Sequence, residues 1–193
     1  LGDKPLIQYI FDAARCSKYI DQLVLSTDDE GIAVVAKELG IEVPFMRPEE
    51  LARDDSSLIS VIKHAMRYFD DLGIKVDGVL SLQPTCPFLN TRTIDKAVEL
   101  WLNSGCDSVT TVSEITKGHP YISKRLKENG RIEDFCVIPE GADNRQRQYR
   151  EKAYYLTGGL YLRNRSLVES DKSGSHHLGE DSRSIIINEI ESL

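Results

Sequence analysis

Cysteine, histidine and long apolar runs are all scarce in this sequence of 193 residues, and each shortage excludes a class of protein. The four cysteines, at positions 16, 86, 106 and 136, form no Cys-x-x-Cys pair, so neither a zinc site nor a disulfide framework is indicated. The adjacent pair His176-His177 has no nearby cysteine and carboxylate set and predicts only weak, adventitious metal binding. No apolar run approaches the roughly 20 residues that cross a bilayer, and the first residues do not resemble a signal peptide. We therefore expect a cytoplasmic protein that does not contact a membrane.

Basic residues are also in deficit. The sequence has 24 lysines and arginines against 31 aspartates and glutamates, a formal net charge of −7. Nucleic-acid binding in general needs a basic face that displaces counterions, so nucleic acid is not an expected partner. A small anionic ligand held by a few local arginines remains compatible with this charge. With 40% hydrophobic residues, the chain is long enough for one sizeable core, and we expect a single domain over residues 1–193.

Short apolar segments alternate with stretches of helical periodicity along most of the chain. The helices are predicted near residues 5–15, 30–39, 58–69, 91–104 and 164–170, and the strands near 23–25, 42–46, 79–82, 107–112, 153–162 and 184–188. Strand-helix-strand units with short connections favour an α/β fold, with a mostly parallel sheet and helices on both faces.

The alternation breaks between residues 113 and 149. This stretch contains His119-Pro120, a charged segment from Lys124 to Arg131, and a polar run that ends in Arg147-Gln148. Its pattern predicts a projecting hairpin or arm followed by a polar loop, in place of another helical crossover.

Polar residues follow several of the predicted strands. The four clusters are 26–29, Arg47 together with 54–57, 83–85, and Arg147-Gln148 leading to Tyr161. In an open α/β sheet, ligands bind outside the carboxyl ends of the strands, so we expect the clusters to converge at one edge. Arginine there suits phosphate, carboxylate or the edge of a base. Each cluster also has a simpler interpretation: Asp28 and Asp29 suit a helix cap, and Tyr161 suits sheet packing.

These clusters, taken in order, resemble the acylneuraminate cytidylyltransferases, the family that makes CMP-sialic acid and related CMP-nonulosonic acids. Six segments carry the resemblance over nearly the whole chain, and each is weak alone. They are Lys4-Pro5-Leu6-Ile7, Leu25-Ser26-Thr27-Asp28-Asp29, Arg47-Pro48-Glu49-Glu50-Leu51-Ala52, Leu82-Gln83-Pro84-Thr85-Cys86-Pro87-Phe88, Arg147-Gln148 and Gly158-Gly159-Leu160-Tyr161.

The resemblance implies a Rossmann-like, three-layer domain of the GT-A-like nucleotidyltransferase type. It implies an enzyme that joins CTP to a sugar acid, with Mg²⁺ as cofactor and pyrophosphate as the second product. Residues 113–149 are implied to form an arm that reaches across a homodimer and supplies a loop of the sugar site. The implied nucleotide-binding residues are Asp28, Arg47 and Ser57, and the implied sugar-acid residues are Gln83, Lys124, Arg147, Gln148 and Tyr161.

The sequence departs from the family pattern in several places. The glycine-rich triphosphate loop that precedes the first helix in the family is absent, and no metal ligand is assigned because the family's acidic metal motif is expected after Leu193. We therefore expect these 193 residues to bind CTP and Mg²⁺ poorly by themselves and to be inactive alone. Thr157 and Leu89 replace an asparagine and an arginine of the pattern and bear on which sugar acid fits. The alternatives are a ketodeoxyoctonate cytidylyltransferase and a non-catalytic sugar-binding or dimerising module.

Overall fold

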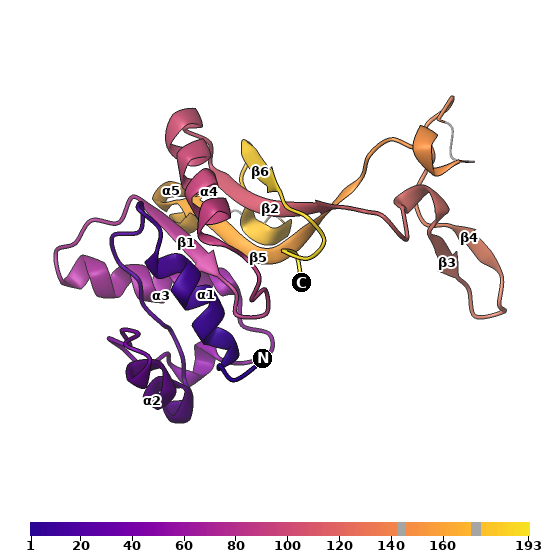
Figure 1. Ribbon diagram of the computed structural model, residues 1–193. Helices are drawn as coiled ribbons and strands as arrows, with labels where there is room; N and C mark the ends of the chain where they lie inside the picture. Colours follow the sequence, from indigo (N-terminus) through magenta and orange to yellow (C-terminus); the bar gives the residue numbers. More distant parts are fainter. Residues whose placement is uncertain (143–145, 171–174) are drawn as a thin grey trace.

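The computed structural model describes residues 1–142, 146–170 and 175–193. A body built around a four-stranded sheet carries a long arm that extends to one side (Figure 1). The helices of the body are α1 (Leu6–Arg15), α2 (Glu30–Glu38), α3 (Leu58–Asp71), α4 (Thr91–Ser104) and α5 (Arg165–Glu169). Its strands are β1 (Gly78–Leu82), β2 (Ser108–Glu114), β5 (Tyr154–Asn164) and β6 (Ser182–Ile186). Short 3-10 turns lie at Glu49–Leu51 and Ser175–His177.

The sheet has the strand order β1-β5-β2-β6 and is mixed. β2 and β6 pair in parallel, whereas β5 lies antiparallel between β1 and β2. The predicted α/β class is confirmed, but the expectation of a mostly parallel sheet needs correction at β5. After β2 the chain runs out into the arm and returns beside the strand it left, and this excursion reverses the direction of β5.

The predicted strands at 23–25 and 42–46 are shorter than expected. The two segments meet at isolated parallel bridges, Val24 to Glu42 and Thr27 to Met46, and do not form a longer ladder among the described residues. They still run side by side in the predicted direction. Polar turns follow both, and the bridge at Thr27 places the Arg47 backbone beside the 27–29 turn, where the Arg47 N–H donates to the Thr27 carbonyl at 2.8 Å.

The helix ends follow local sequence signals. Asn90 caps α4 because its side chain accepts a hydrogen bond from the Thr93 N–H at 3.1 Å, and Gly105 ends the helix in the left-handed conformation with φ of 66°. Between these ends, Ile94, Ala97 and Val98 recur at helical spacing and are buried.

Two apolar layers enclose the sheet. On one face, α1 and α4 pack against Leu160 and Leu162 of β5 and Val109 of β2 in the largest core cluster. Successive strand residues point to opposite faces, so Tyr161 and Arg163 belong to the other face. There, Ile62 and Met66 of α3 pack against Val168 of α5 and partly buried Val79 of β1. This second face is therefore apolar around Val79 and polar around Tyr161 and Arg163.

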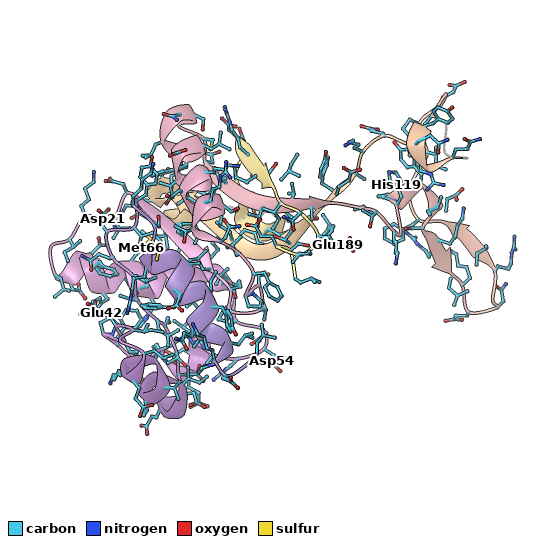
Figure 2. The ribbon with its side chains drawn as sticks, in the orientation of Figure 1. Asp21, Glu42, Asp54, Met66, His119 and Glu189 are labelled. Atoms are coloured by element: carbon cyan, nitrogen blue, oxygen red, sulfur yellow. The ribbon has the colours of Figure 1, made fainter. Side chains whose placement is uncertain are left out.

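The arm consists of residues 115–153, with a two-stranded sheet of β3 (Lys124–Leu126) and β4 (Ile132–Asp134) and 3-10 turns at Pro120–Ile122 and Arg147–Tyr149. Figure 2 shows His119 out in the arm, well away from Glu189 beside the sheet. The His119 ring joins the two halves of the arm, because its Nε2 lies 2.8 Å from the Glu151 carbonyl and its Nδ1 accepts the Tyr121 N–H. The predicted projection is therefore present.

In the part of the chain that the structure describes, no helix combines the length and the apolar character needed to cross a bilayer.

Candidate functional site

A cavity of about 480 Å³ lies between the first turns of α3 and the polar part of the sheet face that carries β5. Leu58 and Ile59 supply its apolar wall. Its polar lining comes from three parts of the chain that are far apart in sequence. These residues are Ser57, Ser60 and Lys63 at the start of α3, Tyr161 and Arg163 on β5, and Ser170, His176 and His177 after α5.

The α3 side of the cavity is fixed by a helix cap. The Ser57 side chain accepts a hydrogen bond from the Ser60 N–H at 3.2 Å, and the two hydroxyls lie 3.2 Å apart. The cap explains why α3 begins at Leu58, and it turns the positive end of the helix dipole toward the hollow. Ser57, predicted to bind the nucleotide, therefore has a structural role and also lines the cavity.

The β5 side combines an aromatic ring with a buried cation. Tyr161 is 8% exposed and Arg163 is 2% exposed. The Arg163 Cζ lies 4.7 Å from the centre of the Tyr161 ring, an arrangement that favours a cation–π contact. Burial raises the pKa of the Tyr161 hydroxyl and lowers the pKa of the Arg163 guanidinium, because both charged forms lose hydration. The predicted sugar-site residue Tyr161 thus lies in the same cavity as Ser57.

Two backbone carbonyls hold the Arg163 guanidinium. Its Nε donates to the His177 carbonyl at 2.9 Å and its Nη2 donates to the His176 carbonyl at 2.8 Å. Both histidines have positive φ, 58° and 52°, a conformation that is costly outside glycine. The His176 ring lies nearly parallel to Tyr161, with ring centres 6.5 Å apart.

The turn after β1 is held against β5. The Gln83 N–H donates to the Gly159 carbonyl at 3.0 Å, and a Cβ at position 159 would lie 2.8 Å from the Cys86 Cβ, so the approach requires glycine. Near this point the pairing of β2 with β5 shifts register, and Gly158 has φ of 81°. The hydrogen bond to Gly159 places the predicted sugar-site residue Gln83 beside β5, two residues before Tyr161, although Gln83 does not line the cavity.

Arg47 and Asp28, both predicted to bind the nucleotide, form a pair of their own. The Arg47 Nη2 lies 2.5 Å from the Asp28 Oδ1, and this hydrogen bond holds the pKa of the Asp28 carboxyl below its ordinary value. The Arg47 Nε is buried without a hydrogen-bond partner among the described residues. Asp29, not Asp28, caps α2 by accepting the Ile32 N–H at 2.8 Å. The capping alternative therefore holds for Asp29 alone.

The remaining predicted residues lie on the arm and not at the cavity of their own chain. Lys124 pairs with Asp134 across the β3–β4 hairpin, and the Gln148 Nε2 donates to the Gln146 Oε1 at 2.6 Å. The backbone of Arg147 begins the last 3-10 turn of the arm, and its side chain lies outside the described residues. The four clusters therefore converge only in part, because the arm carries these three residues away from the sheet (Figure 1).

Thr157 and Leu89, the two departures in the matched region, are both engaged in the fold. The Thr157 hydroxyl lies 2.7 Å from the Thr111 hydroxyl, and Leu89 is 2% exposed in the main core. Neither lines the cavity.

A metal centre is not evident in the described part of the chain, since no three histidines, cysteines or carboxylates gather there in a way that could hold an ion. The Mg²⁺ ligands were expected by resemblance after Leu193, and the described residues offer no alternative set.

Sequence reasoning missed Arg163. The signal was present, because strand alternation places residues 161 and 163 on the same face, and an arginine in a run of otherwise apolar residues is unusual. His176 and His177 were considered only as a metal site, whereas their carbonyls hold the guanidinium. No local pattern indicates that contact, because it joins β5 to a loop more than ten residues further along the chain.

Comparison with known proteins gives consistent matches. A family model described as cytidylyltransferase matches residues 1–162. The CMP-N,N'-diacetyllegionaminic acid synthase of Legionella pneumophila is 32% identical over 191 residues, covering 98% of this chain and 78% of the relative. A pseudaminic acid cytidylyltransferase of Campylobacter jejuni is 30% identical over 162 residues, covering 82% of this chain and 67% of the relative.

Solved structures show the same fold at low identity. A CMP:2-keto-3-deoxy-manno-octonic acid synthetase complexed with CTP superposes with a TM-score of 0.66 at 14% identity, covering 96% of this chain and 80% of the other. A 4-diphosphocytidyl-2C-methyl-D-erythritol synthase from Anaerococcus prevotii gives a TM-score of 0.63 at 12% identity, with 96% and 78% covered. Both likenesses concern the fold alone.

Proposed function

Because this chain belongs to the cytidylyltransferase family, we propose that it serves an enzyme that transfers CMP from CTP to a nonulosonic acid, a sialic-acid-like sugar. The observation that carries the proposal is the match to the Legionella pneumophila synthase over 98% of the chain. The cavity supports it, because Ser57 and Tyr161, which the resemblance assigns to the nucleotide and to the sugar, line one hollow.

The proposed reaction is a single displacement at the α-phosphorus of CTP. The oxygen of the sugar's anomeric hydroxyl forms a bond to this phosphorus while the bond to the bridging oxygen breaks. Pyrophosphate leaves with the electron pair, and the hydroxyl proton passes to water. The protein contributes chiefly alignment of the two reactants and stabilisation of the negative charge.

In this proposal the two sides of the cavity have different tasks. On the α3 side, Ser57 serves the cytidine. Arg47 and Asp28, which pair with each other outside the cavity lining, are assigned to the same nucleotide. On the β5 side, Tyr161 serves the sugar acid. Gln83, outside the cavity lining but bonded to the Gly159 carbonyl of β5, is assigned to the same ligand. The helix dipole of α3 favours a negatively charged ligand in the hollow.

We propose further that the protein is a homodimer in which the arm crosses to the second copy. Lys124, Arg147 and Gln148 lie on the arm, so they would meet a cavity only across such an interface. The arm also exposes large apolar side chains to an unusual degree, and these surfaces suit a protein contact. They are Leu126, Ile132, Phe135 and Val137.

A divalent cation is proposed because CTP is a triphosphate whose charge such ions neutralise. The described residues do not fit a metal site, and no step is assigned to the ion. The cytoplasm remains the proposed compartment, since Cys86 and Cys106 are buried free thiols that suit a reducing environment.

The decisive experiment measures pyrophosphate release from CTP by the complete gene product. N-acetylneuraminic, N,N'-diacetyllegionaminic, pseudaminic and ketodeoxyoctonic acids are supplied in turn, each with and without Mg²⁺. Turnover with one of the first three supports the proposal, and turnover confined to ketodeoxyoctonic acid replaces it with the related synthetase. Sugar binding in calorimetry without turnover for any of the four indicates a non-catalytic module.

A further inference from the structure

Arg163 is a buried cation without a carboxylate partner among the described residues. It is 2% exposed, and within the described part of the chain its side chain donates hydrogen bonds only to the His176 and His177 carbonyls. The third nitrogen, Nη1, is buried with no hydrogen-bond partner in the described structure. A buried charge with an unsatisfied donor is costly to fold, so such a group is generally completed by a ligand or serves a site.

The guanidinium is held in a fixed orientation next to the cavity. The two carbonyl contacts are made by residues that both adopt positive φ, so the loop accepts backbone strain in order to present both oxygens to the same side chain. The Tyr161 ring contacts the same guanidinium at 4.7 Å. With Nε and Nη2 occupied, Nη1 is the donor left for a molecule in the cavity that Arg163 lines.

The rest of the lining also suits an anion. The Ser57 and Ser60 hydroxyls lie at the N-terminal end of the 14-residue helix α3, where the dipole is positive. Aspartate and glutamate are missing from the described lining. A carboxylate suits the remaining Nη1 donor, because a hydrogen bond between a cationic donor and an anionic acceptor is stronger than one between neutral groups.

We propose that Arg163 binds the carboxylate of the sugar acid, an inference that rests on the proposed function. In nonulosonic acids this carboxylate is attached to the anomeric carbon, which also bears the hydroxyl that attacks CTP. Holding the carboxylate therefore orients the nucleophile. It also selects acidic ulosonic sugars over neutral sugars, since a neutral ligand leaves the buried guanidinium unsatisfied.

The test compares each of the three nonulosonic acids with its methyl ester, which keeps the sugar but removes the negative charge. Calorimetry on the complete gene product should show the preferred acid binding about tenfold or more tighter than its ester. Arg163→Gln should bind acid and ester alike, at the level of the ester. The matched control is Arg183→Gln, because Arg183 is an exposed arginine of β6 that pairs with Asp181 and is not in the cavity. It should keep the full preference.

Kinetics give a second readout. Arg163→Gln should raise the KM for the sugar acid by about tenfold or more and leave the KM for CTP unchanged. Because the residue is buried, folding of each variant is checked by thermal melting. If Arg163→Gln does not fold, Arg163→Lys replaces it and should keep part of the preference for the acid, since it retains the charge but loses the planar fork.

The outcomes separate this inference from the proposed function. An undiminished preference for the acid in folded Arg163→Gln overturns the assignment, whatever the enzyme's activity. A preference that depends on Arg163, without pyrophosphate release, supports the assignment and contradicts the proposed reaction. If none of the three acids binds, both are overturned.

Discussion

The sheet and the arm differ in where their apolar side chains lie. In the sheet, Leu160 is fully buried and Leu162 is 4% exposed, whereas in the arm Leu126 is 72% and Val137 is 91% exposed. The hydrophobic effect thus stabilises the body within one chain but does little for the arm. A β-hairpin with so little burial is marginal in water, and this difference is the reason for proposing that the arm docks on a second copy.

The largest effect is expected from truncating a buried side chain in the body. Leu160→Ala should lower the free energy of unfolding by about 2–5 kcal/mol, because it leaves a cavity among well-packed neighbours. Leu126→Ala, the same change on the arm, should alter it by about 0.5 kcal/mol or less when the protein is dilute. Urea denaturation of both variants measures the two losses in the free energy of unfolding. Equal losses would contradict the view that the arm contributes little to the stability of a single chain.

The next effect concerns assembly. Val137→Asp should raise the dimer dissociation constant by at least about tenfold, because it places an unpaired charge in the proposed interface. Val34→Asp is the control, since Val34 is 55% exposed on α2, away from the arm. Light scattering during size-exclusion chromatography over a dilution series gives the constant. A monomer in the unmodified protein, or equal effects of the two changes, would refute the role given to the arm.

A smaller effect is expected at Ser57, where two substitutions distinguish the capping of α3 from the binding of CTP. Ser57→Ala should cost about 1 kcal/mol of stability because α3 loses its cap. Ser57→Asn retains a capping oxygen and should restore most of that stability, while its larger side chain intrudes on the cavity. Thermal melting and CTP titration distinguish the two roles. Normal CTP affinity in both variants would leave Ser57 with its capping role alone.

The smallest effect tests the ion pair between half-buried Arg47 and exposed Asp28. The pKa of the Asp28 carboxyl is lowered in the folded state, so the stabilisation is present above its ordinary value near pH 4 and disappears as the pH falls through the lowered value. NMR titration of the carboxyl should show this lowered pKa, and Arg47→Gln should raise it again. An unchanged pKa in that variant would exclude Arg47 as the cause.

Features governed by neighbouring residues could be predicted from the sequence. The helix predicted near 91–104 is confirmed, and the local signals at its ends are the cap at Asn90 and the left-handed Gly105. The projecting arm was also predictable, because the charged stretch from Lys124 to Arg131 interrupts the alternation of helices and strands. The expected convergence of the polar clusters is met only for Ser57 and Tyr161, which line one cavity although Tyr161 lies within β5 and not at a strand end.

Features that depend on distant pairing could not be predicted in this way. The antiparallel direction of β5 is set by its place between β1 and β2, and nothing within residues 154–164 specifies it. The ion pair of Arg47 with Asp28 joins two turns through a single bridge at Thr27. The hydrogen bonds of Arg163 go to the backbone carbonyls of His176 and His177, whereas the sequence predicted only weak metal binding by their side chains.

β5 starts at the root of the arm and ends at the floor of the cavity, a span of eleven residues. One continuous strand therefore connects Tyr154, next to the arm, to Arg163 at the cavity. If the arm docks on a second copy, the affinity for the sugar acid depends on the concentration of the protein. Dilution that separates the two copies would then weaken binding of the acid.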